Sequence, residues 1–228
     1  MSFRRLVLRA AIALLTVGFA GAARAADKPA AATPATTPAP SAAAPATSDP
    51  AAAMREWQRL AAPGKAHEAL GKFAGAWDAK TKMWLGGPGS APTEDTGLAT
   101  FRMVLGGRFL QQDFSGQMTM PDATGKPQKL LFQGIGFMGY DNFRNLYTST
   151  WNDNMSTITM TMAGSASPDG QTIRMFGQMD DPAQNSVGRT YQTVVRWVDA
   201  DHFVFEMYDM LAGPDAKVME IAYSRKKA

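Results

Sequence analysis

Hydrophobic and polar residues alternate along most of the chain after residue 72. The alternation is regular from Trp77 to Met83, and a period of two is typical of a strand with one buried face. Nine more segments have strand patterning and are mostly separated by turn-forming residues: 97–105, 108–120, 129–139, 144–151, 155–163, 171–178, 190–198, 202–210 and 217–226. Because no helix separates these segments, they predict an all-β domain, either a sandwich or an up-and-down barrel of about ten antiparallel strands.

A different pattern precedes the strands, over residues 49–71. Asp49 followed by Pro50 is a typical helix start, since the carboxylate caps free backbone N–H groups and proline suits the first helical position. Apolar residues then recur at helical spacing, at Met54, Trp57, Leu60 and Ala61. We predict a short helical lid or plug over residues 49–71 and a β-barrel domain over residues 72–228.

The two ends of the predicted barrel carry complementary residues. The first strand begins with Gly75-x-Trp77, and the last strand places Arg225 on the same face as Tyr223. A guanidinium can stack on an indole face. This pattern resembles that of the calycins, which include the lipocalins and the fatty-acid-binding proteins, where the two residues meet at the closure of the barrel. It favours a barrel over a sandwich and gives Gly75, Trp77 and Arg225 a structural role in closure.

Further motifs extend the likeness to one family. They are His67-Glu68-x-Leu70, Val104-Leu105-Gly106-Gly107-Arg108-Phe109-Leu110, Gly134-x-Gly136-x-x-Gly139-Tyr140-Asp141-Asn142, Trp151-x-Asp153 and Glu220-Ile221-x-Tyr223-x-Arg225. With them, the chain from about His67 to Arg225 is similar to the bacterial family named domain of unknown function 1579. The resemblance implies a fold and no particular reaction.

The first 48 residues differ in composition from the rest. Residues 1–25 have the basic start, apolar run and small-residue end of a secretory signal peptide, and the run is too short for a membrane anchor. Residues 26–48 are mostly Ala, Pro, Thr and Ser, which predicts a disordered linker. We expect a bacterial periplasmic or secreted protein that is soluble after signal removal, without stable membrane insertion.

Charge and cysteine content exclude several classes of function. The precursor has 23 basic and 20 acidic side chains, and loss of the four arginines of the signal peptide leaves 19 basic side chains and a net charge of −1. A nearly neutral domain without a basic stripe does not predict nucleic-acid binding. Without cysteine, the chain has no disulfide, no thiolate metal site and no acceptor for a lipid anchor.

Glycines at alternate positions of one predicted strand need a separate interpretation. Gly134, Gly136 and Gly139 match the dinucleotide-binding fingerprint, but that site needs a helix at the third glycine, and a turn follows here. We interpret these glycines as a place where a bulky neighbour, such as an indole, packs against bare backbone. No cofactor is predicted.

The fifteen methionines and two histidines raise the question of a metal. Thioethers can bind Cu(I), but the pairs Met118/Met120 and Met160/Met162 suit an adaptable barrel interior better. His67 and His202 are too few for a multi-histidine site, and a haem would need one of them as an axial ligand. We predict no metal site.

Four further side chains are candidates for a ligand site, namely Arg108, Tyr140, Trp151 and Asp153. They either gather at one mouth of the barrel, or Arg108 and Asp153 form a buried ion pair with the aromatic rings around it. With Met160 and Met162, they are the candidate ligand-binding residues. No spacing of nucleophile, acid or base identifies a catalytic residue.

Three hypotheses of function follow. The first is an exported lipocalin-like barrel that binds a small, largely apolar molecule in its interior. The second is an interaction module with a filled barrel, which docks a protein partner through its outer face or N-terminal helix, with Trp84 as an exposed anchor. The third is an enzyme with an unrecognised site near Arg108 and Asp153; the absence of a catalytic motif makes this the weakest.

Overall fold

The computed structural model describes residues 49–87, 89–181 and 185–227, all within one compact unit, Thr47–Ala228. The predicted signal peptide (1–25) and linker (26–48) lie outside the described residues.

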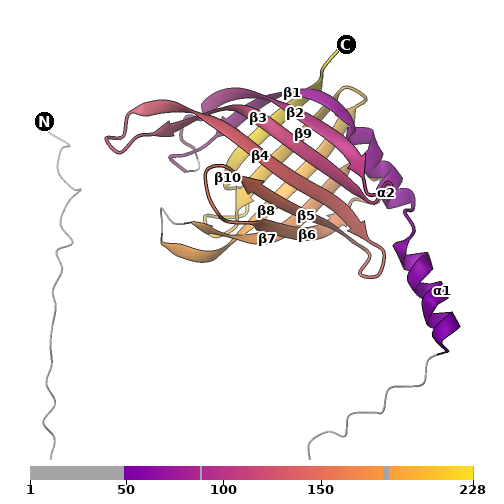
Figure 1. Ribbon diagram of the computed structural model, residues 1–228. Helices are drawn as coiled ribbons and strands as arrows, with labels where there is room; N and C mark the ends of the chain where they lie inside the picture. The colour runs from indigo at the N-terminus through magenta and orange to yellow at the C-terminus, as the bar shows by residue number, and fades with distance from the viewer. Residues whose placement is uncertain (1–48, 88, 182–184, 228) are drawn as a thin grey trace, which may run out of the picture. The chain divides into compact units, whose positions relative to one another are not determined.

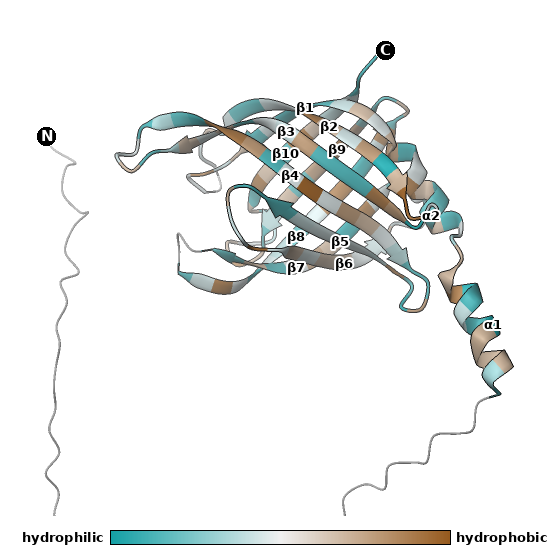
Figure 2. Cartoon of the chain, viewed as in Figure 1, coloured by the Kyte–Doolittle hydropathy of each residue, from teal (hydrophilic) through white to brown (hydrophobic). Residues whose placement is uncertain are grey.

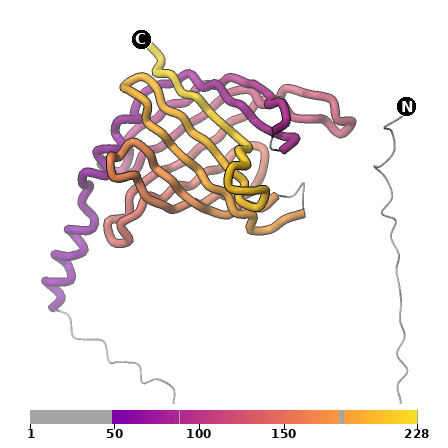
Figure 3. The backbone as a smooth tube through the Cα atoms, turned by 180° about the vertical axis from the view of Figure 1, so that it is seen from behind, coloured from indigo at the N-terminus to yellow at the C-terminus, as the bar shows by residue number. Residues whose placement is uncertain are grey.

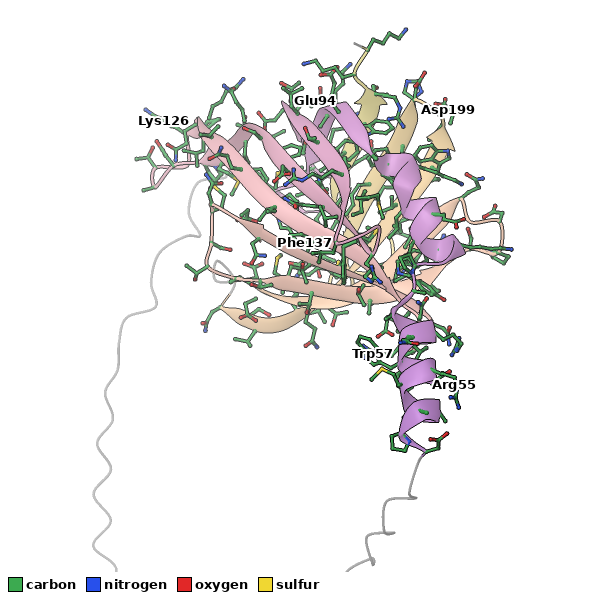
Figure 4. The ribbon with its side chains drawn as sticks, turned by 45° about the vertical axis from the view of Figure 1, so that its right-hand side comes forward. Arg55, Trp57, Glu94, Lys126, Phe137 and Asp199 are labelled. Carbon is green, nitrogen blue, oxygen red and sulfur yellow. The ribbon has the colours of Figure 1, made fainter. Side chains whose placement is uncertain are left out.

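Two helices and a short 3-10 turn precede the strands: α1 (Pro50–Ala61), α2 (Lys65–Leu70) and η1 (Gly71–Phe73). The carboxylate of Asp49 caps α1 by accepting hydrogen bonds from the backbone N–H groups of Ala51 and Ala52. α1 buries none of its residues, and Trp57, which projects from it in Figure 4, is 66% exposed. Among the described helices, none has both the length and the apolar character needed to cross a bilayer.

Ten strands follow: β1 (Gly75–Met83), β2 (Thr93–Val104), β3 (Phe109–Pro121), β4 (Pro127–Asp141), β5 (Leu146–Asp153), β6 (Met160–Ala166), β7 (Thr172–Asp181), β8 (Ser186–Asp199), β9 (His202–Asp209) and β10 (Lys217–Arg225). Each strand pairs antiparallel with its neighbours in sequence, and β1 also pairs with β10. The sheet therefore closes, as Figures 1 and 3 show from opposite sides. The predicted all-β fold, a ten-stranded antiparallel up-and-down barrel, is confirmed.

The closure joins the first strand to the last through Trp77 and Arg225. These residues are partners in the β1–β10 register, and the guanidinium carbon of Arg225 lies 4.1 Å from the centre of the indole. The guanidinium also donates hydrogen bonds to the carbonyl oxygens of Ala74, Lys72 and Ala200, at 2.9–3.0 Å. One side chain therefore ties β10 to the chain before β1 and to the β8–β9 turn.

Aromatic and aliphatic side chains fill the end of the barrel next to α2 and η1, here called the closed end. Trp77 and Leu70 are completely buried there, and the indole N–H of Trp77 donates to the carbonyl of Phe73 at 2.8 Å. The ring of Phe203 meets those of Phe73 and Trp77 edge to face, with centroids 5.0 and 4.7 Å apart. Elsewhere along the strands hydrophobic and polar residues alternate, as Figure 2 shows.

At the opposite, open end, the β3–β4 hairpin extends beyond its neighbours. The β2–β3 pairing stops at Gly97 and Gly116, whereas the β3–β4 pairing continues to Pro121 and Pro127. The hairpin therefore projects from the barrel in Figure 1.

Two polar side chains bind the free edges of this hairpin. On the β3 side, the carboxylate of Asp95 accepts hydrogen bonds from the backbone N–H of Thr119 at 2.7 Å and from its hydroxyl at 2.8 Å. On the β4 side, Asn154 accepts from the N–H of Gln133 and donates to the carbonyl of Leu131. Backbone groups that lack a strand partner are thereby satisfied.

One predicted strand is displaced. The sequence predicts a strand over 155–163, but β6 begins only at Met160. Side chains turn the chain before it: the carboxylate of Asp153 accepts from the N–H of Met155, and the hydroxyl of Thr159 donates to the side chain of Asn152. Such local bonds compete with strand pairing, which is why the alternating pattern misplaces this boundary.

Replacement of Arg225 should destabilise the barrel strongly. Arg225→Ala removes the indole contact and leaves three carbonyl groups without their donor, so we expect a loss of about 2 kcal/mol in the free energy of unfolding, measured by urea denaturation. Lys226→Ala, at the exposed neighbouring residue, is the control and should change stability by less than about 0.5 kcal/mol. Equal stability of the two variants would contradict the closing role of Arg225.

Candidate functional site

The interior of the barrel between the closed end and the open mouth is hollow. It contains a cavity of about 300 Å³ with lining residues from all ten strands. This volume is at the lower end of the range of roughly 300–1,000 Å³ that is common for small-molecule sites. The barrel is therefore not filled by its own side chains.

Methionines dominate the lining. Eleven of the fifteen in the sequence contribute to it: Met83, Met118, Met120, Met138, Met155, Met160, Met162, Met175, Met179, Met207 and Met219. Methionine is flexible and polarisable, so a wall built from it can adapt to ligands of different shape. Met162 is also held in place, because its sulfur accepts a hydrogen bond from the buried hydroxyl of Thr193 at 3.4 Å.

Trp151 lies flat on one wall of the cavity. Gly136 and Gly134 of β4 pair with Trp151 and Asp153 of β5, and a methyl group added at either glycine would overlap the indole. The interpretation as bare backbone beneath an indole is thus confirmed for Gly134 and Gly136, whereas a methyl group at Gly139 would meet the ring of Phe109. The indole N–H donates to the carboxylate of Asp153 at 3.1 Å, which fixes the orientation of the ring.

A polar pair lies deeper in the cavity. The side-chain amide of Gln112 donates to the hydroxyl of Tyr223 at 3.3 Å, and both residues line the cavity. Burial raises the pKa of Tyr223, and the hydrogen bond from Gln112 lowers it only in part, so the phenol stays protonated at neutral pH. Its O–H can therefore donate a hydrogen bond to a ligand.

Arg108 and Tyr140 lie at the closed end, outside the cavity lining. The guanidinium of Arg108 donates to the carbonyl of Ala61 at 2.9 Å, at the last residue of α1. Asn142, from the same motif as Tyr140, donates to the carbonyls of Leu60 and Ala62, both at 2.8 Å. These two motif residues therefore satisfy carbonyl groups at the C-terminal end of α1.

The sequence-predicted candidates thus separate into two groups. Trp151, Asp153, Met160 and Met162 line the cavity, whereas Arg108 does not. The expected gathering of Arg108 with Asp153, whether as ligand contacts or as a buried pair, does not form, because β3 begins at the closed end and β5 finishes at the open end. Tyr140 instead packs on Tyr147, with ring centroids 5.0 Å apart.

The histidines have local structural partners. The Nδ1 atom of His67 accepts a hydrogen bond from the backbone N–H of Gly64 at the start of α2. His202 pairs with Asp199 across the exposed β8–β9 turn. Among the described residues, no three His, Cys, Asp or Glu side chains come together in a way that would hold a metal ion.

The lining contains polar residues that are not among the sequence-predicted candidates, including Asp95, Gln112 and Tyr223. The period of two already places Tyr223 on the inner face of β10, and Gln112 is a polar residue at an inward position of β3. Asp95 was missed because the predicted strand began at residue 97, whereas β2 begins at Thr93.

Fold and cavity define a closed ten-stranded antiparallel β-barrel with an apolar internal chamber. The chain belongs to the family described as protein of unknown function (DUF1579), whose sequence profile matches residues 62–225. The resemblance found in the sequence motifs is thereby confirmed. The match begins directly after α1 and includes all ten strands. A search of curated proteins gives no matching relative.

Alanine at Gly134 should disturb the indole of Trp151. We expect Gly134→Ala to lower the free energy of unfolding by about 1–3 kcal/mol and to change the near-ultraviolet circular dichroism, because the added methyl group forces the ring away from the wall. Gly71→Ala is the control, since Gly71 has a helical backbone and open space around it; this variant should be neutral or slightly stabilised. An unchanged spectrum in Gly134→Ala would contradict the packing described.

Proposed function

We propose that this protein binds a small, largely apolar molecule inside the barrel, as a lipocalin-like carrier. The observation that carries the proposal is the methionine-lined cavity of about 300 Å³. Ligand sites are typically concave and apolar with a few polar groups that set orientation. Gln112, Tyr223 and Asp153 are polar groups of that kind in this lining.

The hollow interior and the positions of Trp84, Arg108 and Asp153 support this function over the two alternatives. The hypothesis of an interaction module assumed a filled barrel, whereas the interior is hollow. Its proposed anchor, Trp84, is half-buried rather than exposed. An enzyme site built on Arg108 and Asp153 lacks its geometry, because the two side chains bind different partners at opposite ends of the barrel.

The proposed carrier acts in the periplasm or outside the cell. The support is the sequence of residues 1–25, which has the three parts of a secretory signal. Expression of the full chain in a bacterium, followed by fractionation and N-terminal sequencing, tests this location. Cleavage before Ala26 is expected; a protein that retains residues 1–25 in the cytoplasm would overturn it.

Native mass spectrometry of protein purified from its own cell envelope tests ligand binding directly. We expect an added mass that disappears after extraction with organic solvent, and the extract then identifies the molecule. Protein that carries no added mass and also binds none of a panel of small apolar probes would refute the carrier function.

Filling the cavity should abolish binding without unfolding the barrel. Ser149 lines the cavity on β5, between the inward residues Tyr147 and Trp151, so a phenylalanine there occupies ligand space. Ser149→Phe should lower affinity for an apolar fluorescent probe at least tenfold. Ser115→Phe, on the exposed outer face of β3, adds the same ring outside and should bind like the unmodified protein. Equal binding by both variants would place the probe outside the barrel.

A further inference from the structure

The cavity lining carries negative charge and no positive charge. Its carboxylates are those of Asp95 and Asp153, and the described residues of the lining include no Lys, Arg or His. Both carboxylates are held by neutral donors: Thr119 binds Asp95, and the N–H groups of Trp151 and Met155 bind Asp153. Neither charge is neutralised from within the lining.

One cation near the open mouth, Arg189, is already paired with acidic groups. Strand alternation directs Arg189 of β8 inward, but its guanidinium donates hydrogen bonds to the buried carboxylate of Asp209. The carboxylate of Asp181 on β7 also attracts this guanidinium electrostatically, so the cation already has two acidic neighbours. An anionic molecule in the cavity would therefore lose its hydration without gaining a cationic partner, which is costly.

Trp151 adds a surface that attracts positive charge. One face of its indole lies on the backbone of Gly134 and Gly136, the ring of Phe132 stacks beside it with ring centroids 6.3 Å apart, and the residue lines the cavity. The ring N–H points to the carboxylate of Asp153, so the negative charge lies at the edge of the ring, next to its N–H group. Tryptophan is the side chain that binds cations best through its ring, and a desolvated site strengthens the attraction. Asp153 also keeps free lone pairs, since it accepts two of about four hydrogen bonds.

We propose that the ligand is an organic cation with an apolar body. Its charged group lies over Trp151 beside Asp153, and its body lies among the methionines and the rings of Phe101 and Phe203. This inference rests on the proposed carrier function and adds the charge of the ligand to it. It separates this cavity from a site in which a cationic side chain holds the carboxylate of a fatty acid, because no Lys, Arg or His is among the described lining residues.

Three probes of equal chain length and different charge test the inference: octyltrimethylammonium, 1-octanol and octanoate, titrated into the full barrel at pH 7 and low salt by isothermal calorimetry. We expect the cation to bind at least tenfold more tightly than octanoate, with 1-octanol between them. Added salt should narrow the gap between the cation and 1-octanol.

Two variants with the same change of charge locate the effect. Asp153→Asn should lower affinity for octyltrimethylammonium at least fivefold and leave 1-octanol unchanged. Asp78→Asn, on the exposed outer face of β1, is the matched control and should bind all three probes like the unmodified protein. Near-ultraviolet circular dichroism checks folding, and if Asp153→Asn does not fold, Trp151→Phe takes its place with the same expectation.

The outcomes separate the two levels of the proposal. Octanoate binding as tightly as the cation, or an equal loss of all probes in Asp153→Asn, overturns the cationic ligand and leaves the carrier function in place. Binding of none of the three probes by the unmodified protein counts against the carrier function itself. A preference for the cation that disappears only in Asp153→Asn or Trp151→Phe supports the inference.

Discussion

The interior space depends on the pairing of β1 with β10, which makes a continuous cylinder from a sheet that otherwise ends in two free edges. Arg225 is central to that pairing, because it covers Trp77 and binds carbonyl groups before β1 and in the β8–β9 turn. A charged side chain is well suited to this position, since several backbone oxygens converge there and each needs a donor. Without the closure, the methionines of the inner face would be exposed to water rather than gathered around a cavity.

The two ends of the barrel contain different types of side chain. At the closed end, rigid rings such as Trp77, Phe73 and Phe203 meet edge to face and leave little space. Toward the open mouth, methionines replace them, and the largest ring, Trp151, is flattened against glycine backbone rather than projecting inward. The glycines are thus what keeps a bulky side chain from filling the chamber. The closed end is therefore rigid, whereas the methionine side chains around the cavity can change conformation to fit a ligand.

The fold was predictable because its signals are local or lie at the ends of the chain. A period of two fixes strands and their faces, and Gly75-x-Trp77 with Arg225 indicates how they close. The role of Gly134 and Gly136 was also predictable, since alternate glycines in a strand leave a space beside the backbone that a bulky neighbouring side chain must fill. The grouping of Arg108 with Asp153 failed for a geometric reason. Alternate strands of an up-and-down barrel run in the same direction, so the start of β3 and the finish of β5 belong to opposite ends.

The volume of the chamber was not predictable, because it depends on how far each side chain extends from a curved wall. The roles of Arg108 and Asn142 were equally hidden, since their partners are carbonyl groups of α1 and leave no pattern in side-chain types. Motif residues can thus serve a segment that lies outside the matched region 62–225.

The projecting β3–β4 hairpin affects the behaviour of the protein at high concentration. A closed barrel offers no free strand edge to another chain, but a hairpin that extends beyond its neighbouring strands has free edges on both sides. Here Pro121 and Pro127 at its end cannot donate backbone hydrogen bonds, and Lys126, labelled in Figure 4, and Lys129 add charge. With Asp95 and Asn154 already bound along its sides, the hairpin is a poor template for a foreign strand, and the barrel can keep an open mouth without promoting its own aggregation.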